Sequence, residues 1–362
     1  MTDEHRKIKV LHVLNRMETG GIQSIVLDYY RTIDKDKFHF DFLVCRNSDC
    51  PFEDELIKSG ARIIRTPKFY EPISYYFFVN DYLKENQYDI IHSHVGTLSF
   101  LPLLAAYRNN IKIRICHIHS ITDVKEGIKA LTKVILRPFS KMFANVYFSC
   151  GKKVAKWMYG DNPDVYIMEN AIKVDRFRFD PIKRERIRKG YGIPDDALLI
   201  GHIGWFIKLK NQQFLVRILE KLIKKKENAY LMFIGGGKQV EKIKRMVKDK
   251  GLNDRVRFIG NIKDTSDYYS AFDVFCLPSL FEGMPVVTIE AQSNGLPTII
   301  SASITREAER NDNCVFLPLD QPEMWIKSFH KLGRTDIINV EDIEEKCLKL
   351  ENKYLELVNE DE

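Results

Sequence analysis

Two glutamates in one short segment are well placed to bind a polar ligand. Glu282 and Glu290 lie in the run LFEGMPVVTIEAQSNGLP, where Gly283, Met284 and Pro285 follow the first acid. Gly283 lets a ligand approach the backbone, and Pro285 favours the start of a helix. Amides at a helix start offer hydrogen bonds and the positive end of a helix dipole to an anion. A carboxylate at each end of this unit can then bind hydroxyls on two parts of one ligand.

The two acids also have a purely structural explanation. Glu282 could cap the helix and Glu290 could be a solvated helix residue, as in most such pairs. Two features favour a ligand site instead. Glu290 lies in the otherwise apolar run VVTIEAQ, where a buried charge without a partner is costly. The strand-like run VFCLPS precedes the pair, and ligands of open α/β sheets bind where such strands end.

Glycines after other strand-like runs could bring backbone amides close to a phosphate or a base. Gly20 and Gly21 separate a first strand-like run from a first helical one, and Gly235 opens three successive glycines after NAYLMFI. Ile262 ends Gly-Asn-Ile after VRFI. The first loop is not GxGxxG, so a dinucleotide cofactor is not expected. Simple turns between strand and helix would explain the same glycines.

Two pairs of histidines occupy alternate positions of strand-like runs. His92 and His94 lie in YDIIHSH, and His117 and His119 lie in KIRICHIHS. Alternate residues of a strand point to the same face of the sheet, so this spacing could assemble a metal site. No acidic or cysteine partner that would complete such a site is evident, and histidines at strand ends are commonly just hydrogen-bonded. We therefore expect no metal.

The elements that must position these residues alternate between short strand-like runs and longer segments with helical spacing of their apolar residues. Runs rich in Val, Ile and Phe are separated by amphipathic segments such as IQSIVLDYYRTI, which predicts βαβ units and parallel sheets. At 362 residues the chain is long enough for two domains. We expect one domain over residues 1–172 and another over 173–340. The segment 341–362 predicts a final amphipathic helix, which could end the second domain or cross back to complete the first; we expect the crossing.

The bulk composition is that of a globular protein. Hydrophobic residues make up 44% and charged residues 29% of the chain. Neither a signal peptide nor an apolar run of about eighteen residues is present, and seven scattered cysteines suit reduced thiols in the cytoplasm. The net charge of +6 suits phosphorylated ligands or anionic lipid. No nucleic-acid-binding motif occurs, so no nucleic-acid partner is expected.

One segment, residues 125–143, predicts a basic stripe beside an apolar face. Its basic residues recur every four positions and are Lys125, Lys129, Lys133, Arg137 and Lys141. Pro138 should interrupt the helix that carries them. Such a surface suits peripheral contact with an anionic membrane. A solvated cationic helix face is the commoner outcome of this pattern.

Taken in order, these motifs resemble the family-4 retaining glycosyltransferases over nearly the whole chain, with most likeness to bacterial exopolysaccharide and capsule enzymes. The resemblance implies the GT-B fold, with two Rossmann-like domains whose parallel sheets face each other across a cleft. It also implies that Glu282 contacts hydroxyls of the donor sugar and that Glu290 holds the ribose. Amides of Gly283, Met284 and Pro285 would lie near the sugar and phosphates.

The remaining motifs are assigned in the same way by the resemblance. The loop of Gly20 and Gly21 would face the donor diphosphate and the acceptor. Gly235 matches the glycine-rich turn of the family, and Ile262 matches the position that contacts the base. A base held by backbone groups and an apolar side chain fits uracil. His119 is the best match to the histidine beside the reacting sugar, with His117 as the alternative.

The segment IGHIGWFIKLKNQQFL departs from the family pattern. Relatives carry Gly-Arg-Phe, a spacer and Lys-Asn, and the arginine and lysine together bind the diphosphate. Lys210 and Asn211 match, but Trp205 occupies the arginine position. Lys208 could supply the missing charge, although an ammonium cannot reproduce the bidentate fork of a guanidinium. Trp205 could equally be a core or lid aromatic.

The implied reaction moves a sugar from a nucleoside diphosphate, with UDP favoured, to a hydroxyl of a glycan or lipid-linked acceptor. The anomeric configuration would be retained. Lys210 would stabilise the leaving diphosphate, whose oxygen would accept the acceptor's proton, so neither a cofactor nor a metal is implied. Two other functions stay open: a nucleotide-sugar epimerase of the same architecture, and, because of Trp205, a weakly active homologue that supports a partner transferase.

Overall fold

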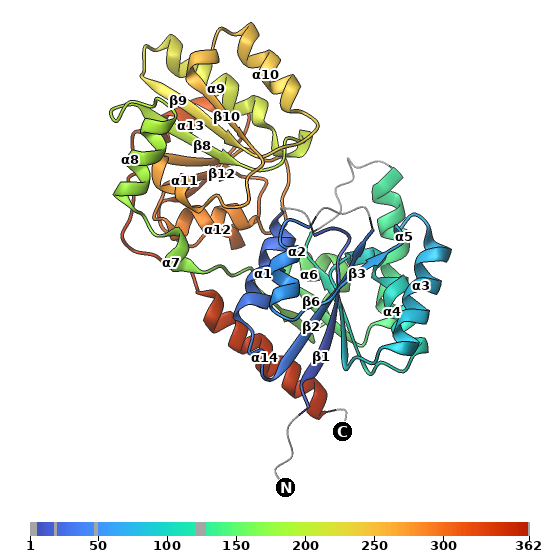
Figure 1. Cartoon of the computed structure of the whole chain (residues 1–362). Helices are drawn as coiled ribbons and strands as arrows, with labels where there is room; N and C mark the ends of the chain where they lie inside the picture. Colours follow the sequence, from blue (N-terminus) through green and yellow to red (C-terminus); the bar gives the residue numbers. More distant parts are fainter. Residues whose placement is uncertain (1–5, 18–19, 47–49, 121–127, 361–362) are drawn as a thin grey trace. The chain divides into compact units, whose positions relative to one another are not determined.

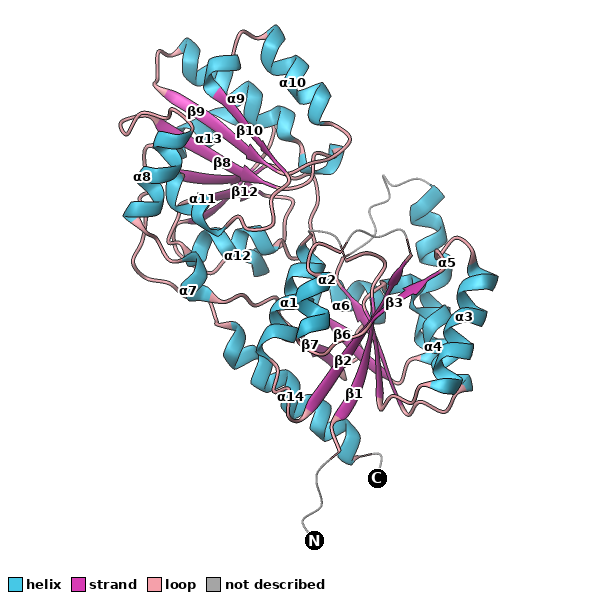
Figure 2. Ribbon diagram, viewed as in Figure 1, coloured by secondary structure: helices cyan, strands magenta, loops and turns pink. Residues whose placement is uncertain are grey.

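The computed structural model describes residues 6–17, 20–46, 50–120 and 128–360, with the side chains of 128–133 left out. Its contacts divide the chain into two compact units (Figures 1 and 2). The first unit comprises Met1–Asn170 and Ile343–Glu362, and the second comprises Ala171–Asp342. The predicted divisions after residues 172 and 340 lie two residues from these boundaries.

The first unit contains a parallel sheet with seven described strands in the order β3-β2-β1-β4-β5-β6-β7. Its strands are β1 (Ile8–Val13), β2 (Phe38–Cys45), β3 (Ile63–Thr66), β4 (Ile90–Ser93), β5 (Ile113–Ile118), β6 (Val146–Ser149) and β7 (Val165–Ile167). Its helices are α1 (Gly21–Thr32), α2 (Glu53–Lys58), α3 (Pro72–Glu85), η1 (Gly96–Ser99), α4 (Phe100–Arg108), α5 (Ile128–Phe143), α6 (Lys152–Tyr159) and α14 (Ile343–Asn359).

The second unit contains a parallel sheet with six described strands in the order β10-β9-β8-β11-β12-β13. Its strands are β8 (Leu198–Ile203), β9 (Ala229–Ile234), β10 (Val256–Gly260), β11 (Val274–Leu277), β12 (Thr298–Ser301) and β13 (Cys314–Leu317). Its helices are α7 (Val174–Phe177), α8 (Pro181–Gly190), η3 (Lys208–Lys210), α9 (Gln212–Lys224), α10 (Val240–Asp249), η4 (Asn253–Arg255), α11 (Ser266–Ala271), α12 (Val286–Ser293), η5 (Arg306–Ala308) and α13 (Pro322–Phe329).

Both sheets reverse their strand order once, and these reversals position the candidate site residues. In the first sheet β1 lies beside β4, and in the second β8 lies beside β11. Loops that leave the carboxyl ends of such neighbouring strands diverge to opposite faces and leave a crevice, where ligands of doubly wound sheets bind. The fold therefore predicts one ligand-binding edge in each unit.

The C-terminal helix α14 belongs to the first unit. It packs on α1, its buried residues include Cys347, Leu350 and Tyr354, and Figure 2 shows α3, α4 and α5 together on the other side of the sheet. The backbone amide of Asp34 also donates to Glu351 of α14 at 2.9 Å. Burial of this apolar face explains why the helix returns to the first unit.

The predicted interruption of a helix at Pro138 is wrong, because α5 continues through it from Ile128 to Phe143. Pro138 has no N–H group, so the carbonyl of Val134 loses its helical partner. Both residues lie on an exposed part of the helix, so water can satisfy that carbonyl. The buried Ser140 hydroxyl donates to the carbonyl of Thr97 at 2.6 Å. Packing against α4 and η1 thus stabilises a helix that proline weakens.

Candidate functional site

The carboxyl ends of β8 and β9 are joined by close backbone packing that only glycine permits. Gly235 has φ +135°, and a Cβ at this position would lie 2.2 Å from the carbonyl oxygen of Gly204. A Cβ on Gly237 would lie 2.8 Å from the backbone of Phe206. The amide of Gly235 donates to the carbonyl of Gly260 at 2.8 Å. The glycine-rich turn therefore has a packing role, whatever ligand its amides bind.

Lys210 and Glu282 come together at the β8/β11 reversal. The Lys210 ammonium lies 2.6 Å from Oε1 of Glu282, and both side chains are mostly buried, at 16% and 14% exposed. That oxygen receives no hydrogen bond of good geometry in the described part of the chain, so the contact is better called an ion pair than a hydrogen bond. The two motifs that the sequence places 72 positions apart thus form one charged centre.

Backbone contacts hold these two loops together. The amide of Leu280 donates to the carbonyl of Leu209 at 2.8 Å. Asn211, in the left-handed conformation with φ +54°, donates from its side chain to the carbonyl of Pro278 at 3.1 Å. Asparagine tolerates this conformation better than most residues. Asn211 therefore has a structural role in aligning Lys210 with Glu282.

His202 and Gln212 lie beside this centre and were not predicted as site residues. The carbonyl of Cys276 lies 2.9 Å from Nδ1 of His202 and can only accept, so Nδ1 carries the hydrogen. Gln212 donates to Nε2 of His202 at 3.3 Å and to the carbonyl of Trp205 at 2.9 Å. Burial lowers the pKa of His202 to about 4, which keeps the ring neutral.

Glu290 lies on α12 and is oriented by a buried tyrosine from α11. The hydroxyl of Tyr269 donates to Oε2 of Glu290 at 2.5 Å. Tyr269 is fully buried, and burial raises its pKa well above the usual value, so it remains a donor. The expected helix starts at Val286 with Pro285 in the N-cap position. Glu282 lies upstream and does not cap this helix.

The remaining predicted residues of the second unit lie along the same sheet edge with different exposure. Trp205 is 38% exposed, and its ring lies near Gly236. Lys208 is exposed on η3, and Ile262 is half-buried after β10. Gly283 is half-buried, whereas Met284 and Pro285 are buried. Exposed Trp205 rules out the simple interpretation of a core aromatic.

The first unit carries its own cluster at the β1/β4 reversal. Gly20 caps α1 and Gly21 is its first residue. The four predicted histidines lie on one sheet face with His12, which pairs in register with His92. His12 was missed because it is a lone histidine within the apolar run KVLHVL. His119 is the most accessible of the five, since the other four are buried.

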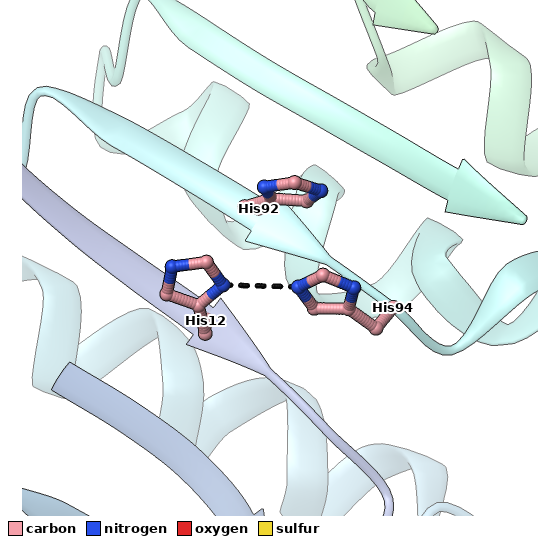
Figure 3. Close-up of side chains that lie close together, drawn as sticks. All are labelled: His12, His92 and His94. Carbon is pink, nitrogen blue, oxygen red and sulfur yellow. Dashed lines mark hydrogen bonds between the residues drawn. The ribbon is translucent and has the colours of Figure 1, made fainter. Parts of the chain in front are cut away.

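The histidines form two separate hydrogen-bonded chains. Nδ1 of His12 lies 2.9 Å from Nε2 of His94, and Nδ1 of His94 lies 3.0 Å from Nε2 of His119. In the second chain, Nδ1 of His92 lies 2.6 Å from the Tyr354 hydroxyl, and its Nε2 lies 3.0 Å from Nδ1 of His117. Figure 3 shows the first bond of the first chain.

Distances alone would allow a metal at two three-histidine groups that share His94. The ligand atoms of His12, His92 and His94 lie within 4.8 Å of one another, as do those of His94, His117 and His119. However, the rings of His92 and His94 stack 4.2 Å apart at 19°, and those of His117 and His119 stack 3.9 Å apart at 29°. Imidazole lone pairs lie in the ring plane. Stacked lone pairs do not converge on one ion. The geometry favours shared hydrogens, and metal independence stays a prediction.

Burial keeps all five imidazoles neutral. It lowers the pKa of His12 to about 3, with Lys35 as the next cause, and lowers the pKa of His119 to about 3. Burial also holds the pKa values of His92, His94 and His117 well below the usual range. At neutral pH each ring therefore has one N–H group and one lone pair.

Two Rossmann-like units with polar clusters at their strand reversals have the architecture of the GT-B glycosyltransferases. Family models support this: "Glycosyltransferase Family 4" matches residues 19–176, and "Glycosyl transferases group 1" matches residues 183–330. The chain belongs to the family-4 glycosyltransferases, as its resemblance to them predicted.

Relatives along nearly the full length are consistent with this family. The chain is 30% identical to the glycosyltransferase EpsF of Bacillus subtilis, over 94% of this chain and 92% of the relative. It is 27% identical to the capsular polysaccharide biosynthesis glycosyltransferase CapH of Staphylococcus aureus, over 90% of each chain. It is 26% identical to an Escherichia coli α-1,3-galactosyltransferase that uses UDP-Gal and α-D-GlcNAc-diphosphoundecaprenol, over 83% of this chain and 81% of that enzyme.

Solved structures confirm the fold. HepE of Anabaena, crystallised with UDP and glucose, superposes with a TM-score of 0.81 at 15% identity, covering 96% of this chain and 99% of that one. WaaG, a glycosyltransferase of lipopolysaccharide biosynthesis, superposes with a TM-score of 0.69 at 18% identity, covering 89% of this chain and 90% of that one.

Among the residues that the structure describes, no helix is long and apolar enough to cross a membrane.

Proposed function

We propose that this protein is a retaining glycosyltransferase that moves a hexosyl or N-acetylhexosaminyl group from a UDP-sugar to a glycan or lipid-linked acceptor hydroxyl. The observation that carries the proposal is the Lys210–Glu282 ion pair at the β8/β11 reversal. Glu290 adds a second carboxylate from helix α12, which follows in the chain. One edge of the sheet thus offers a cation for a diphosphate and two carboxylates for hydroxyls.

Each residue has a distinct part in this reaction. Glu282 binds donor-sugar hydroxyls, and Glu290, oriented by Tyr269, binds the ribose. Lys210 and the amides of residues 283–285 stabilise charge on the leaving diphosphate. Such preorganised electrostatic stabilisation commonly contributes more to catalysis than any other single effect. When the diphosphate leaves, Lys210 can shift from Glu282 toward the new charge.

The proposed transfer needs neither a metal nor a protein base to account for every bond and proton. The acceptor oxygen forms a bond to the anomeric carbon, and the bond from that carbon to the phosphate oxygen breaks. The acceptor's proton passes to the leaving phosphate oxygen. His119 lies beside the reacting sugar in this assignment, and Gly20 and Gly21 supply amides to the diphosphate. Positioning and charge stabilisation then account for the catalysis.

UDP and a lipid-linked acceptor are supported by relatives rather than by this chain alone. The Escherichia coli relative uses UDP-Gal and a diphosphoundecaprenol-linked sugar, and HepE binds UDP and glucose. CapH, a glycosyltransferase of capsular polysaccharide biosynthesis, points to a role in the synthesis of a surface polysaccharide. We accordingly place the protein in the cytoplasm at the inner face of the membrane, where residues 125–143 contact anionic lipid.

Trp205 makes a weakly active homologue the second candidate. Its 38% exposed side chain occupies the position of the family's diphosphate-binding arginine. Exposed Lys208 on η3 can supply one charge but not a bidentate contact. If this weakens the native site, Trp205→Arg should increase donor turnover.

The experiment is a product assay with a set of UDP-, GDP- and TDP-sugars, with and without a diphosphoundecaprenol-linked acceptor. We expect acceptor-dependent release of UDP and a product that keeps the anomeric configuration of the donor, as seen by NMR. Conversion of the donor to an isomeric sugar without acceptor would instead establish the epimerase. Absence of turnover by both the native protein and Trp205→Arg would favour the non-catalytic partner.

A further inference from the structure

The chain of His12, His94 and His119 connects the protein core to the accessible end of the first unit's cluster. The two nitrogen–nitrogen distances are 2.9 and 3.0 Å. His12 and His94 are buried, and His119 is half-buried. The hydrogen bond of His119 in this chain uses Nε2. Nδ1 of His119 is therefore the outer end of the chain, on its half-buried member.

Because each ring is neutral, the two hydrogen bonds cannot point independently. A neutral imidazole has one donor and one acceptor nitrogen. If His12 donates to His94, then His94 must donate to His119, and the outer Nδ1 of His119 carries a hydrogen. If His119 donates instead, the outer Nδ1 is bare and Nε2 of His12 carries a hydrogen. The hydrogen on His119 is thus set at the opposite end of the chain.

The buried end distinguishes the two states. Nε2 of His12 has no hydrogen-bond partner among the described residues and is inaccessible to water. A hydrogen on this nitrogen would be a buried unpaired donor, which proteins avoid more strictly than a buried unpaired acceptor. The ring packs against Phe40, with centroids 4.3 Å apart, and Phe42, whose ring faces accept an N–H much more weakly than oxygen or nitrogen does. We therefore expect Nε2 of His12 to be bare. Nδ1 of His12 then donates to His94, and His94 donates to His119.

We propose that His12 and His94 are positioning residues that hold His119 as a neutral Nδ1–H donor to the substrate. This inference goes beyond the proposed function, which places His119 beside the sugar, and it rests on that function for its catalytic consequence. An Nδ1–H group can stabilise negative charge on a sugar or phosphate oxygen. It cannot act as a base, so the chain assigns His119 a donor role.

The second chain supplies a matched control. The Tyr354 hydroxyl is hydrogen-bonded to His92, which is hydrogen-bonded to His117. Tyr354 is as buried as His12, but within the described residues this chain does not extend to His119. Tyr354→Phe removes only a hydroxyl and should leave the tautomer of His119 unchanged.

The direct test is NMR of the whole protein with ¹⁵N-labelled histidine, which distinguishes Nδ1–H from Nε2–H by nitrogen chemical shifts and long-range couplings. His119 is assigned from His119→Gln. We expect Nδ1–H for His119 at pH 7 in the unaltered protein and in Tyr354→Phe. An Nε2–H tautomer in the unaltered protein would overturn the proposal, and this readout needs no substituted core and no enzymatic activity.

Substitution of His12 links the tautomer to turnover. His12→Leu removes the donor, so His119 should gain the Nε2–H form and kcat should fall about tenfold while the donor KM changes by less than about twofold. His12→Asn places an amide donor near the former Nδ1 and should restore most of kcat. A change in tautomer with unchanged kcat, or no rescue by a folded His12→Asn, would contradict the role in positioning.

The two proposals can fail separately. An Nδ1–H tautomer in a protein without transferase activity would refute the proposed function but leave the hydrogen-bonded chain established. An active transferase with an Nε2–H tautomer would leave the proposed function intact and refute this inference.

Discussion

At the scale of single residues, the candidate site consists of charges that other side chains orient. Lys210 is paired with Glu282, and Tyr269 donates to Glu290. His202 and Gln212 fill the space beside Lys210 with a neutral hydrogen-bonded pair. The two carboxylates thus have different partners, so their proposed contacts with sugar and ribose should be separable by mutation.

We expect Glu282→Gln and Glu290→Gln to have opposite signatures. Glu290→Gln should weaken UDP and UDP-sugar alike, by about 1–3 kcal/mol for one charged hydrogen bond. Glu282→Gln should not weaken UDP binding, because UDP has no donor sugar and Lys210 loses its competing carboxylate, but it should reduce turnover. Calorimetry with UDP and initial rates with the active UDP-sugar measure the two effects.

The two variants control each other, since both replace a carboxylate by an isosteric amide. Equal loss of UDP affinity in both would contradict the separate assignments. Unchanged UDP affinity in a folded Glu290→Gln would show that Glu290 does not hold the ribose.

At the scale of elements, helix α5 leaves several apolar side chains exposed. Its exposed apolar side chains are Val134, Ile135, Phe139 and Met142. Arg137, expected in a basic stripe, instead donates to the carbonyl of Trp157 at 2.8 Å. Lys125 lies outside the described residues, and the side chains of Lys129 and Lys133 are not described. The apolar half of the predicted surface is therefore the part that the structure supports.

We predict that this apolar half inserts into anionic membranes. Phe139 and Met142 are 44% and 66% exposed, and burying such side chains contributes up to about 1.5–3 kcal/mol each. Phe139→Ser combined with Met142→Ser should reduce cosedimentation with phosphatidylglycerol vesicles about tenfold or more. Ile57→Ser is the control, because Ile57 is 55% exposed but lies on a different helix, α2. Equal binding by all three proteins would contradict membrane contact through α5.

At the scale of the whole molecule, buried histidines are distributed unequally between the two units. The first unit holds five histidines whose pKa values burial lowers, of which His12 and His119 have values of about 3. Within its described residues, the second unit holds one, His202, with a value of about 4. Acid should therefore act on the two units differently.

We predict that the first unit loses more stability than the second as pH falls from 7 to 5. Each unfolded histidine takes up a proton near its usual pKa of about 6.5, whereas the folded ring stays neutral until far lower pH. The unfolded state then binds more protons than the folded state, so the free energy of unfolding decreases as the pH is lowered. The slope approaches about 1.4 kcal/mol per pH unit for each such histidine.

Urea unfolding at both pH values measures this difference. Single-tryptophan variants report on each unit, with Trp157 in the first and Trp325 in the second. Equal destabilisation of both units, or greater loss in the second, would show that the buried histidines do not remain neutral.

The sequence by itself determined the class of fold and predicted most of the second-unit candidate site. Alternating periods predicted parallel α/β units, and the run around Glu282 and Glu290 predicted a loop followed by a helix at a strand end. Local signals suffice here because period, glycine and proline act over a few residues. The strands β6, β7 and β13 were not among the predicted strands.

Only the tertiary structure decided which distant residues meet. The pairing of Lys210 with Glu282 depends on β8 lying beside β11, and the chain from His12 to His119 depends on the order β1-β4-β5. The continuity of α5 through Pro138 likewise depends on packing against α4 and η1. Strand order and packing are long-range properties, so no local pattern specifies them. Sequence therefore predicted candidate side chains, and the fold determined which of them meet.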